Sequence, residues 1–198
     1  MTKNTKEHWN QIKLKKPNSQ LTFIHTPKCG GTYVSLILDS LNIRKKGNIC
    51  NKHIQASEHD GITFTVVRDP IKRFESLLNY RLCEDKPRGH DWPTRLNYVY
   101  QDKSVTLDTI VEKMTDKEIT NFSPYRSLVY WSKNVDIFIT IDQLPEFLSF
   151  FGYKYNVSNF SPTNISKKER GTFNDFTINR LKLLYINDLE FYSQVIKN

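Results

Sequence analysis

The chain has 198 residues, of which 38% are hydrophobic and 13% aromatic, and this composition excludes an intrinsically disordered protein. Its longest apolar runs, such as 135–141 and 144–151, are much shorter than the roughly 20 residues of a membrane-spanning helix. The formal net charge of +8 favours an anionic partner, but it does not choose among nucleic acid, an anionic nucleotide and an anionic polysaccharide.

The N-terminal residues 1–19 are polar and rich in lysine, and we expect them to form an arm before a single domain of residues 20–198. This arm has no apolar stretch of the kind that a secretory signal requires. The spacing of Cys29, Cys50 and Cys83 indicates reduced thiols and neither a disulfide framework nor a zinc site. A cytoplasmic protein, or one cut from a longer anchored chain, is therefore expected.

Apolar patterning next predicts two strands, each followed by a helix. The run 21–25 leads into a glycine-containing turn and a helix over 32–41. The continuous run 62–67 is rich in β-branched residues, as in a strand of a parallel sheet. After it, Asp69 can cap a helix and Pro70 can occupy its first position.

The rest of the chain continues the alternation around an irregular insertion at 86–97. The further expected elements are helices over 106–114, 125–132 and 144–151, a strand over 135–141, a polar loop over 158–170 and one long helix over 173–195. Strands that alternate with helices predict an α/β fold, with a central, mostly parallel sheet flanked by helices.

The sharpest functional signal is the segment Thr26-Pro27-Lys28-Cys29-Gly30-Gly31-Thr32, between the first expected strand and helix. Glycines let the backbone approach an anion closely, and the new helix offers free N–H groups and a positive dipole end. Lys28 adds a full charge and Thr32 a hydroxyl donor. A tight turn with a solvated lysine is the simpler interpretation, but the strand–loop–helix context favours a phosphate loop. It is not a Walker A loop, because Lys28 precedes both glycines.

Two segments resemble PAPS-dependent sulfotransferases, above all the carbohydrate group that includes heparan sulfate 2-O-sulfotransferase. Segment 23–34 (FIHTPKCGGTYV) is similar to that family's 5′-phosphosulfate loop, and segment 64–76 (FTVVRDPIKRFES) is similar to its 3′-phosphate motif. The resemblance implies a P-loop NTPase-like three-layer fold and sulfuryl transfer from 3′-phosphoadenosine-5′-phosphosulfate (PAPS) to a hydroxyl. The product nucleotide is then 3′-phosphoadenosine-5′-phosphate (PAP), and no metal is expected. The residues implied to bind the nucleotide are Pro27, Lys28, Cys29, Gly30, Gly31, Thr32, Arg68 and Ser76.

Sulfuryl transfer needs a base for the acceptor hydroxyl and a cation for the departing phosphate, as in phosphoryl transfer. Lys28 suits the departing phosphate and is the first expected catalytic residue. His53 is the second, because the similar 2-O-sulfotransferases carry a histidine base in this region and histidine titrates near neutral pH. His59 and Glu58 are alternative bases, and a surface role for His53 stays open.

The stretch 80–100 interleaves basic and aromatic side chains. Aromatic faces stack on sugar rings and arginine forks bind sulfate or carboxylate, which makes His90, Trp92 and Arg95 candidate acceptor-binding residues. Single-stranded nucleic acid suits the same composition, as does an ordinary packed insertion. We expect a carbohydrate or another hydroxyl acceptor, including an anionic one, and neither a nucleic acid nor a membrane partner. A nucleotide kinase of similar fold and a non-catalytic nucleotide- or polyanion-binding protein are the alternatives.

Three neighbouring side chains are expected outside the chemistry. His25, at the end of the first strand, is expected to be structural, and Arg73 to have a structural or supporting role. Glu75 is expected to be solvated on its helix.

Overall fold

The structure is a computed structural model that describes residues 6–46, 55–57, 61–82, 93–100, 102, 104–121, 126–154 and 170–197. The chain divides into two compact units. Unit 1 comprises Met1–Arg68, Leu128–Asn164 and Glu190–Asn198, and unit 2 comprises Asp69–Ser127 and Ile165–Leu189. Over the described ranges, no helix combines the length and apolar character needed to cross a membrane.

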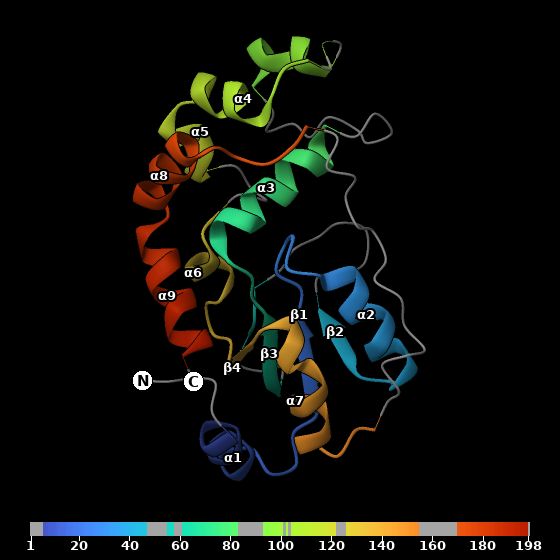
Figure 1. Ribbon diagram of the computed structural model, residues 1–198. Helices are drawn as coiled ribbons and strands as arrows, with labels where there is room; N and C mark the ends of the chain where they lie inside the picture. The colour runs from blue at the N-terminus through green and yellow to red at the C-terminus, as the bar shows by residue number, and fades with distance from the viewer. Residues whose placement is uncertain are drawn as a thin grey trace. The chain divides into compact units, whose positions relative to one another are not determined.

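Unit 1 is built on a parallel sheet with the strand order β2-β1-β3-β4 (Figure 1). The strands are β1 (Leu21–Ile24), β2 (Arg44–Lys46), β3 (Ile62–Val66) and β4 (Ile137–Ile139). Every residue of β1, β3 and β4 is buried, as expected for strands covered on both faces. The predicted mixed α/β architecture with a parallel sheet is therefore confirmed.

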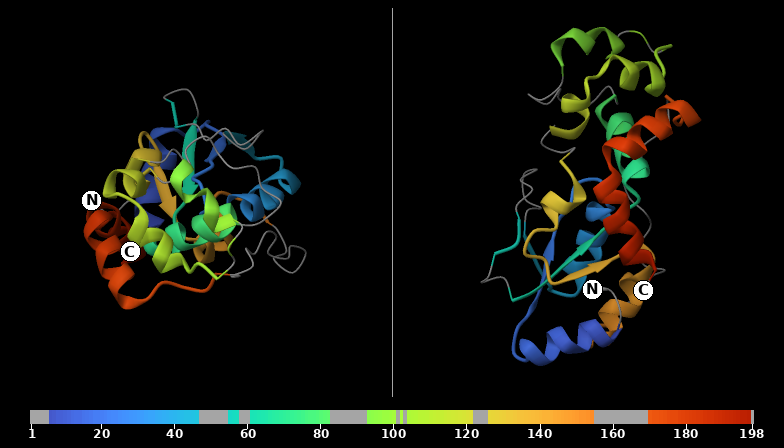
Figure 2. Two further views of the ribbon diagram at one scale, coloured as in Figure 1. Left: turned by 90° about the horizontal axis from the view of Figure 1, so that it is seen from above. Right: turned by 90° about the vertical axis from the view of Figure 1, so that its left-hand side faces the viewer.

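Helices cover both faces of this sheet (Figure 2). The helices of unit 1 are α1 (Lys6–Lys15), α2 (Gly31–Ser40), α6 (Leu128–Trp131), α7 (Leu144–Phe150) and the C-terminal part of α9 (Ile186–Ile196), with a short 3-10 helix η4 (Ile141–Gln143). Alternate strand residues point to opposite faces, so Phe23 and Phe64 pack with α2 and α7. Phe138 faces the other side, where its ring meets that of Phe191 in α9 edge to face at 5.0 Å.

Helix α1 occupies most of the segment expected to be a polar arm. Its Trp9 is 2% exposed and packs edge-on against Phe147 and Phe150 of α7, with ring centroids 5.3 and 5.6 Å apart. Beyond the helix, the Lys16 ammonium donates to the Asp136 carboxylate at 2.8 Å. The polar composition concealed this helix because Trp9 is its only buried residue.

The described residues of unit 2 form helices around a separate core. These helices are α3 (Pro70–Arg81), the 3-10 helix η2 (Thr94–Tyr100), α4 (Leu107–Lys113), α5 (Asp116–Asn121) and α8 (Asp175–Leu184). The predicted start of α3 is confirmed, because the Asp69 side chain accepts a hydrogen bond from the Lys72 N–H at 2.9 Å and Pro70 opens the helix. Helix η2 lies partly in the stretch expected to be irregular.

The single helix expected over 173–195 is instead two helices, α8 and α9, separated at Tyr185. Tyr185 is 5% exposed, and its hydroxyl donates to the Ile119 carbonyl at 2.9 Å. Burial raises the pKa of this phenol. Apolar residues continue on both sides of the break, so the sequence pattern did not reveal it.

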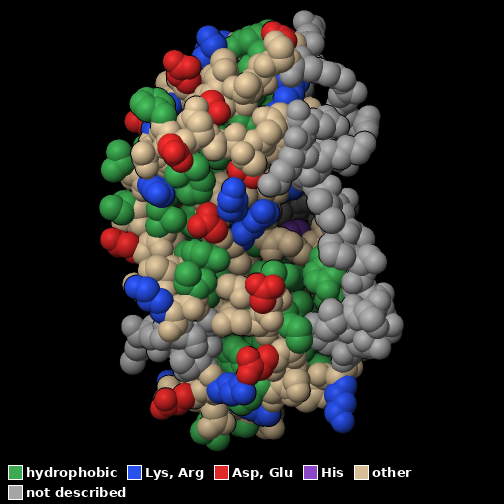
Figure 3. All heavy atoms as spheres, viewed as in Figure 1, with side chains coloured by type: hydrophobic (Ala, Val, Ile, Leu, Met, Phe, Trp, Pro, Cys, Tyr) green, Lys and Arg blue, Asp and Glu red, His purple; other side chains and the backbone are tan. Residues whose placement is uncertain are grey.

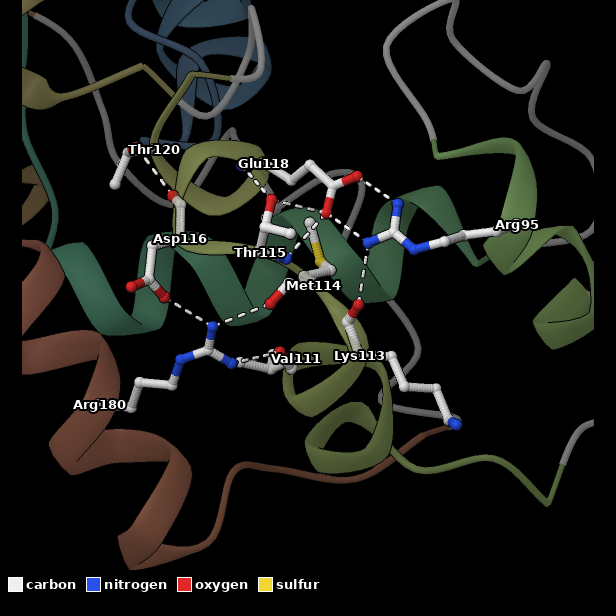
Figure 4. A network of polar contacts seen from close by, with 9 residues as sticks. All are labelled: Arg95, Val111, Lys113, Met114, Thr115, Asp116, Glu118, Thr120 and Arg180. Carbon is white, nitrogen blue, oxygen red and sulfur yellow. Dashed lines mark hydrogen bonds and ion pairs between the residues drawn. The ribbon is translucent and has the colours of Figure 1, made fainter.

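Two arginines connect the helices of unit 2 through polar contacts (Figure 4). Arg95 of η2 donates from both terminal nitrogens to the Glu118 carboxylate, and also to the Lys113 carbonyl at 2.9 Å. The Arg95 guanidinium thereby lowers the pKa of Glu118 to about 2. Arg180 of α8 pairs with Asp116 at 2.6 Å and donates to two carbonyls at the end of α4. These contacts give Arg95 a structural role.

Candidate anion-binding site

The topology of unit 1 singles out one edge of its sheet. From β1 the chain crosses to β2 on one side, and β3 then pairs on the other side of β1. The connections therefore diverge at the carboxyl ends of β1 and β3, which is where ligands bind in open α/β sheets. The β1–α2 loop, residues 25–30, leaves the first of these ends (Figure 1). Arg68 follows the second.

Two buried threonines fix the loop to the neighbouring strand. The Thr26 and Thr65 hydroxyl oxygens are 2.8 Å apart, and the Thr65 hydroxyl donates to the Ile24 carbonyl at 2.7 Å. Because Thr65 uses its one hydrogen in that bond, Thr26 is the donor between the two hydroxyls. Both threonines are at most 1% exposed, so the chain leaves β1 along a fixed path.

The loop backbone turns through left-handed conformations at Lys28 (φ 61°) and Gly30 (φ 81°). For a residue with a side chain this conformation costs about 1–2 kcal/mol, and such strain concentrates at functional sites. Gly30 is also the N-cap of α2, and because it has no side chain it cannot itself cap this end of the helix. The first-turn N–H groups of α2 are therefore available to an anion at the loop.

Gly31 is required by the position of His25. A Cβ atom at Gly31 would lie 2.0 Å from the His25 Nε2 atom. The imidazole also stacks on Phe23, with ring centroids 6.1 Å apart and an interplanar angle of 21°. The structural role predicted for His25 is thus confirmed, and this packing explains the second glycine of the motif.

The remaining loop residues divide between the core and the surface. Cys29 is 4% exposed, and its sulfur lies 3.6 Å from the carbonyl oxygen of Pro27, which is also buried. Their side chains anchor the loop, so only their backbone atoms are candidates for nucleotide contact. Lys28 is half-buried, and Thr32 is exposed in the first turn of α2.

Arg68 is the first residue beyond the hydrogen-bonded part of β3. The Val67 N–H still donates to the Ile139 carbonyl at 2.8 Å, which continues the contact with β4 up to this point. Arg68 is half-buried, and across the described residues its guanidinium has no ion pair or hydrogen bond. A cation in this position favours a ligand that supplies the missing negative charge.

Two α3 residues of segment 64–76 have structural partners. The Arg73 side chain, 3% exposed, donates to the Arg126 carbonyl at 3.0 Å, which supports its structural role. The expectation that Glu75 is solvated is wrong, because it is 3% exposed and pairs with Lys72 at 3.3 Å. Ser76 is half-buried in unit 2, and its pairing with Arg68 on one phosphate stays a prediction.

Several predicted residues lie outside the described part of the chain. These are the proposed base His53, its alternatives Glu58 and His59, and the acceptor candidates His90 and Trp92. Their roles stay predictions. The described acceptor candidate, Arg95, is held by Glu118 and Lys113.

The net charge of +8 does not by itself locate an anion site. On the described part of the face shown in Figure 3, basic side chains are interspersed with acidic ones. The placement of Lys28 and Arg68 therefore bears more directly on anion binding than the net charge does.

Comparisons of the chain with protein-family models, curated proteins and solved structures found no match.

Gly31→Ala should destabilise unit 1 by roughly 1–3 kcal/mol, because the new methyl group forces the His25 ring from its place. Urea unfolding followed by tryptophan fluorescence measures the change. In the His25→Ala background the same substitution should cost much less, since the clashing ring is gone. An equal cost in both backgrounds would show that His25 is not the reason for this glycine.

Proposed function

We propose that the chain is a PAPS-dependent sulfotransferase that transfers a sulfuryl group to an acceptor hydroxyl, with a carbohydrate as the proposed acceptor. The observation that carries this proposal is the position of the β1–α2 loop and Arg68 at the carboxyl ends of two adjacent parallel strands. The loop supports a site for the 5′-phosphosulfate, and the Arg68 guanidinium, which has no partner among the described residues, supports one for the 3′-phosphate. The P-loop NTPase-like assignment of the fold belongs to the same proposal.

In this proposal the loop acts on the leaving group. The acceptor oxygen attacks sulfur while the bond from sulfur to the phosphate oxygen breaks, and negative charge develops on the departing PAP. Lys28 and the first-turn N–H groups of α2 stabilise that charge. His53 takes the acceptor proton, and His90 and Trp92 hold the acceptor. Arg95 is the least supported member of this set, because Glu118 already accepts from both of its terminal nitrogens.

Two other functions make different demands on the same site. A nucleotide kinase would bind ATP with Mg²⁺ and would gain nothing from a 3′-phosphate. A non-catalytic binding protein would bind PAP or a polyanion without turnover. Ligand preference separates the first from a sulfotransferase, and a rate assay separates the second.

Calorimetry should show that PAP binds much more tightly than AMP or ATP, and without added metal, because Arg68 meets the 3′-phosphate. Arg68→Ala should weaken PAP binding about tenfold or more through loss of a charge-assisted contact. Lys182→Ala, which removes an exposed charge on α8, is the control and should change little. Equal affinities for PAP and AMP in the unaltered protein would overturn the nucleotide assignment.

Lys28→Gly and Lys28→Ala both remove the charge, but only glycine also relieves the left-handed backbone. Both should lower sulfuryl transfer from labelled PAPS more than they weaken PAP binding, since the charge acts most strongly in the transition state. The assay uses the best acceptor from a screen of glycans, phenols and tyrosyl peptides. An unchanged rate in both variants would remove Lys28 from the mechanism, and transfer confined to phenols or peptides would overturn the carbohydrate acceptor.

A further inference from the structure

Unit 1 contains a cavity of about 610 Å³ on the face of the sheet that α9 covers. This volume lies within the range of small-molecule sites, roughly 300–1,000 Å³. The residues that line the cavity come mainly from α6, the turn that precedes β4, β4 itself and the end of α9. The residues that line it include Val129, Ser132, Lys133, Phe138, Phe191 and Val195.

This cavity is separate from the candidate anion-binding site. Ser132, Lys133 and Asn134 precede β4, so the cavity lies toward the amino ends of the strands. The β1–α2 loop and Arg68 follow the carboxyl ends of β1 and β3. The face also differs, since α2 packs on the opposite side of the sheet.

The inner wall of the cavity is apolar and belongs to the core. Phe138 is 1% and Val195 3% exposed, and Phe191 packs edge-on against Phe138. Val129, by contrast, is 48% exposed. An apolar body can therefore enter beside Val129 and end against the rings of Phe138 and Phe191.

The wall is held in place by hydrogen bonds from distant parts of the chain. The Gln55 amide donates to the Tyr130 carbonyl at 2.6 Å, and the Asn134 amide donates to the Ala56 carbonyl at 3.4 Å. The left-handed backbone of Asn134, with φ at 61°, shapes the turn before β4. These bonds favour a cavity that is formed before any ligand binds.

Two polar groups point to the kind of ligand. Ser132 lines the cavity and is 8% exposed, yet its hydroxyl has no hydrogen-bond partner within the described ranges. A buried hydroxyl is costly unless it is hydrogen-bonded. Lys133 also lines the cavity and is exposed, and it has no ion pair with any described residue. A hydroxyl donor beside a cation suits an anionic oxygen.

We infer that this cavity binds a small amphipathic anion, with an apolar body against Phe138 and Phe191 and a carboxylate or sulfonate group at Ser132 and Lys133. The proposal does not depend on the sulfotransferase activity, because no residue of the candidate anion-binding site takes part.

The test is a titration with 8-anilinonaphthalene-1-sulfonate, an aromatic body with one sulfonate. The dye itself is excited, and its fluorescence is followed as it binds. The intact chain should bind one equivalent saturably, and saturating PAP should not displace it. Val129→Trp should fill the cavity and weaken binding at least tenfold, as should Gln194→Trp at another lining position. Leu183→Trp, which adds the same ring at an exposed site on α8, is the matched control and should bind normally.

A second probe, the uncharged N-phenyl-1-naphthylamine, separates the apolar from the polar part of the inference. Lys133→Gln should weaken the sulfonate probe severalfold and leave the uncharged probe unchanged. If Lys133→Gln weakened the binding of both probes equally, or of neither, the anion-binding role would be overturned. Unsaturable binding, or binding that survives both cavity-filling variants, would overturn the site itself. Cooperative unfolding of each variant in urea establishes that it is folded.

Discussion

The hydrogen bonds of the Thr65 hydroxyl hold together the two strand ends on which the candidate site depends. This hydroxyl donates to the Ile24 carbonyl and accepts from Thr26, so the last residue of β1 and the first part of its loop are tied to β3. Each such bond contributes about 1 kcal/mol, but its position matters more than its strength. The α2 N-terminus and Arg68 lie at one sheet edge because β1 and β3 end side by side.

The conformation of Lys28 supports a role in binding more strongly than its charge alone. Among described residues, three non-glycine residues have positive φ: Lys28, Asn42 and Asn134. Asparagine tolerates the left-handed region because its short side chain can hydrogen-bond locally, and it serves the two ordinary turns. Lysine has no such advantage, so the loop retains strain that an asparagine or glycine would relieve. Placing a cation beside the start of α2, where the N-cap residue is a glycine, is the compensating gain that we propose.

The sequence was most informative where burial is continuous. Strand β3 is buried along its length, and Asp69 with Pro70 marks the start of α3, so both elements were predicted close to their observed bounds. It was least informative where one buried side chain decides the structure, as Trp9 does for α1 and Tyr185 does between α8 and α9. Within the site, the glycines and Lys28 were evident from the motif. The packing of His25 over Gly31 was not, because nothing in a single sequence shows which side chain a glycine makes room for.

The most direct test of the account is an NMR titration of the ¹⁵N-labelled chain with PAP. Binding at the carboxyl ends of β1 and β3 predicts the largest shift changes at the amides of Gly30, Gly31 and Thr32 and at the Arg68 side-chain Nε–H. The amide signals of α8, which carries exposed Lys182, should not shift. Shift changes spread over exposed lysines, with none in the β1–α2 loop, would contradict the account and reduce PAP binding to nonspecific attraction by the net positive charge.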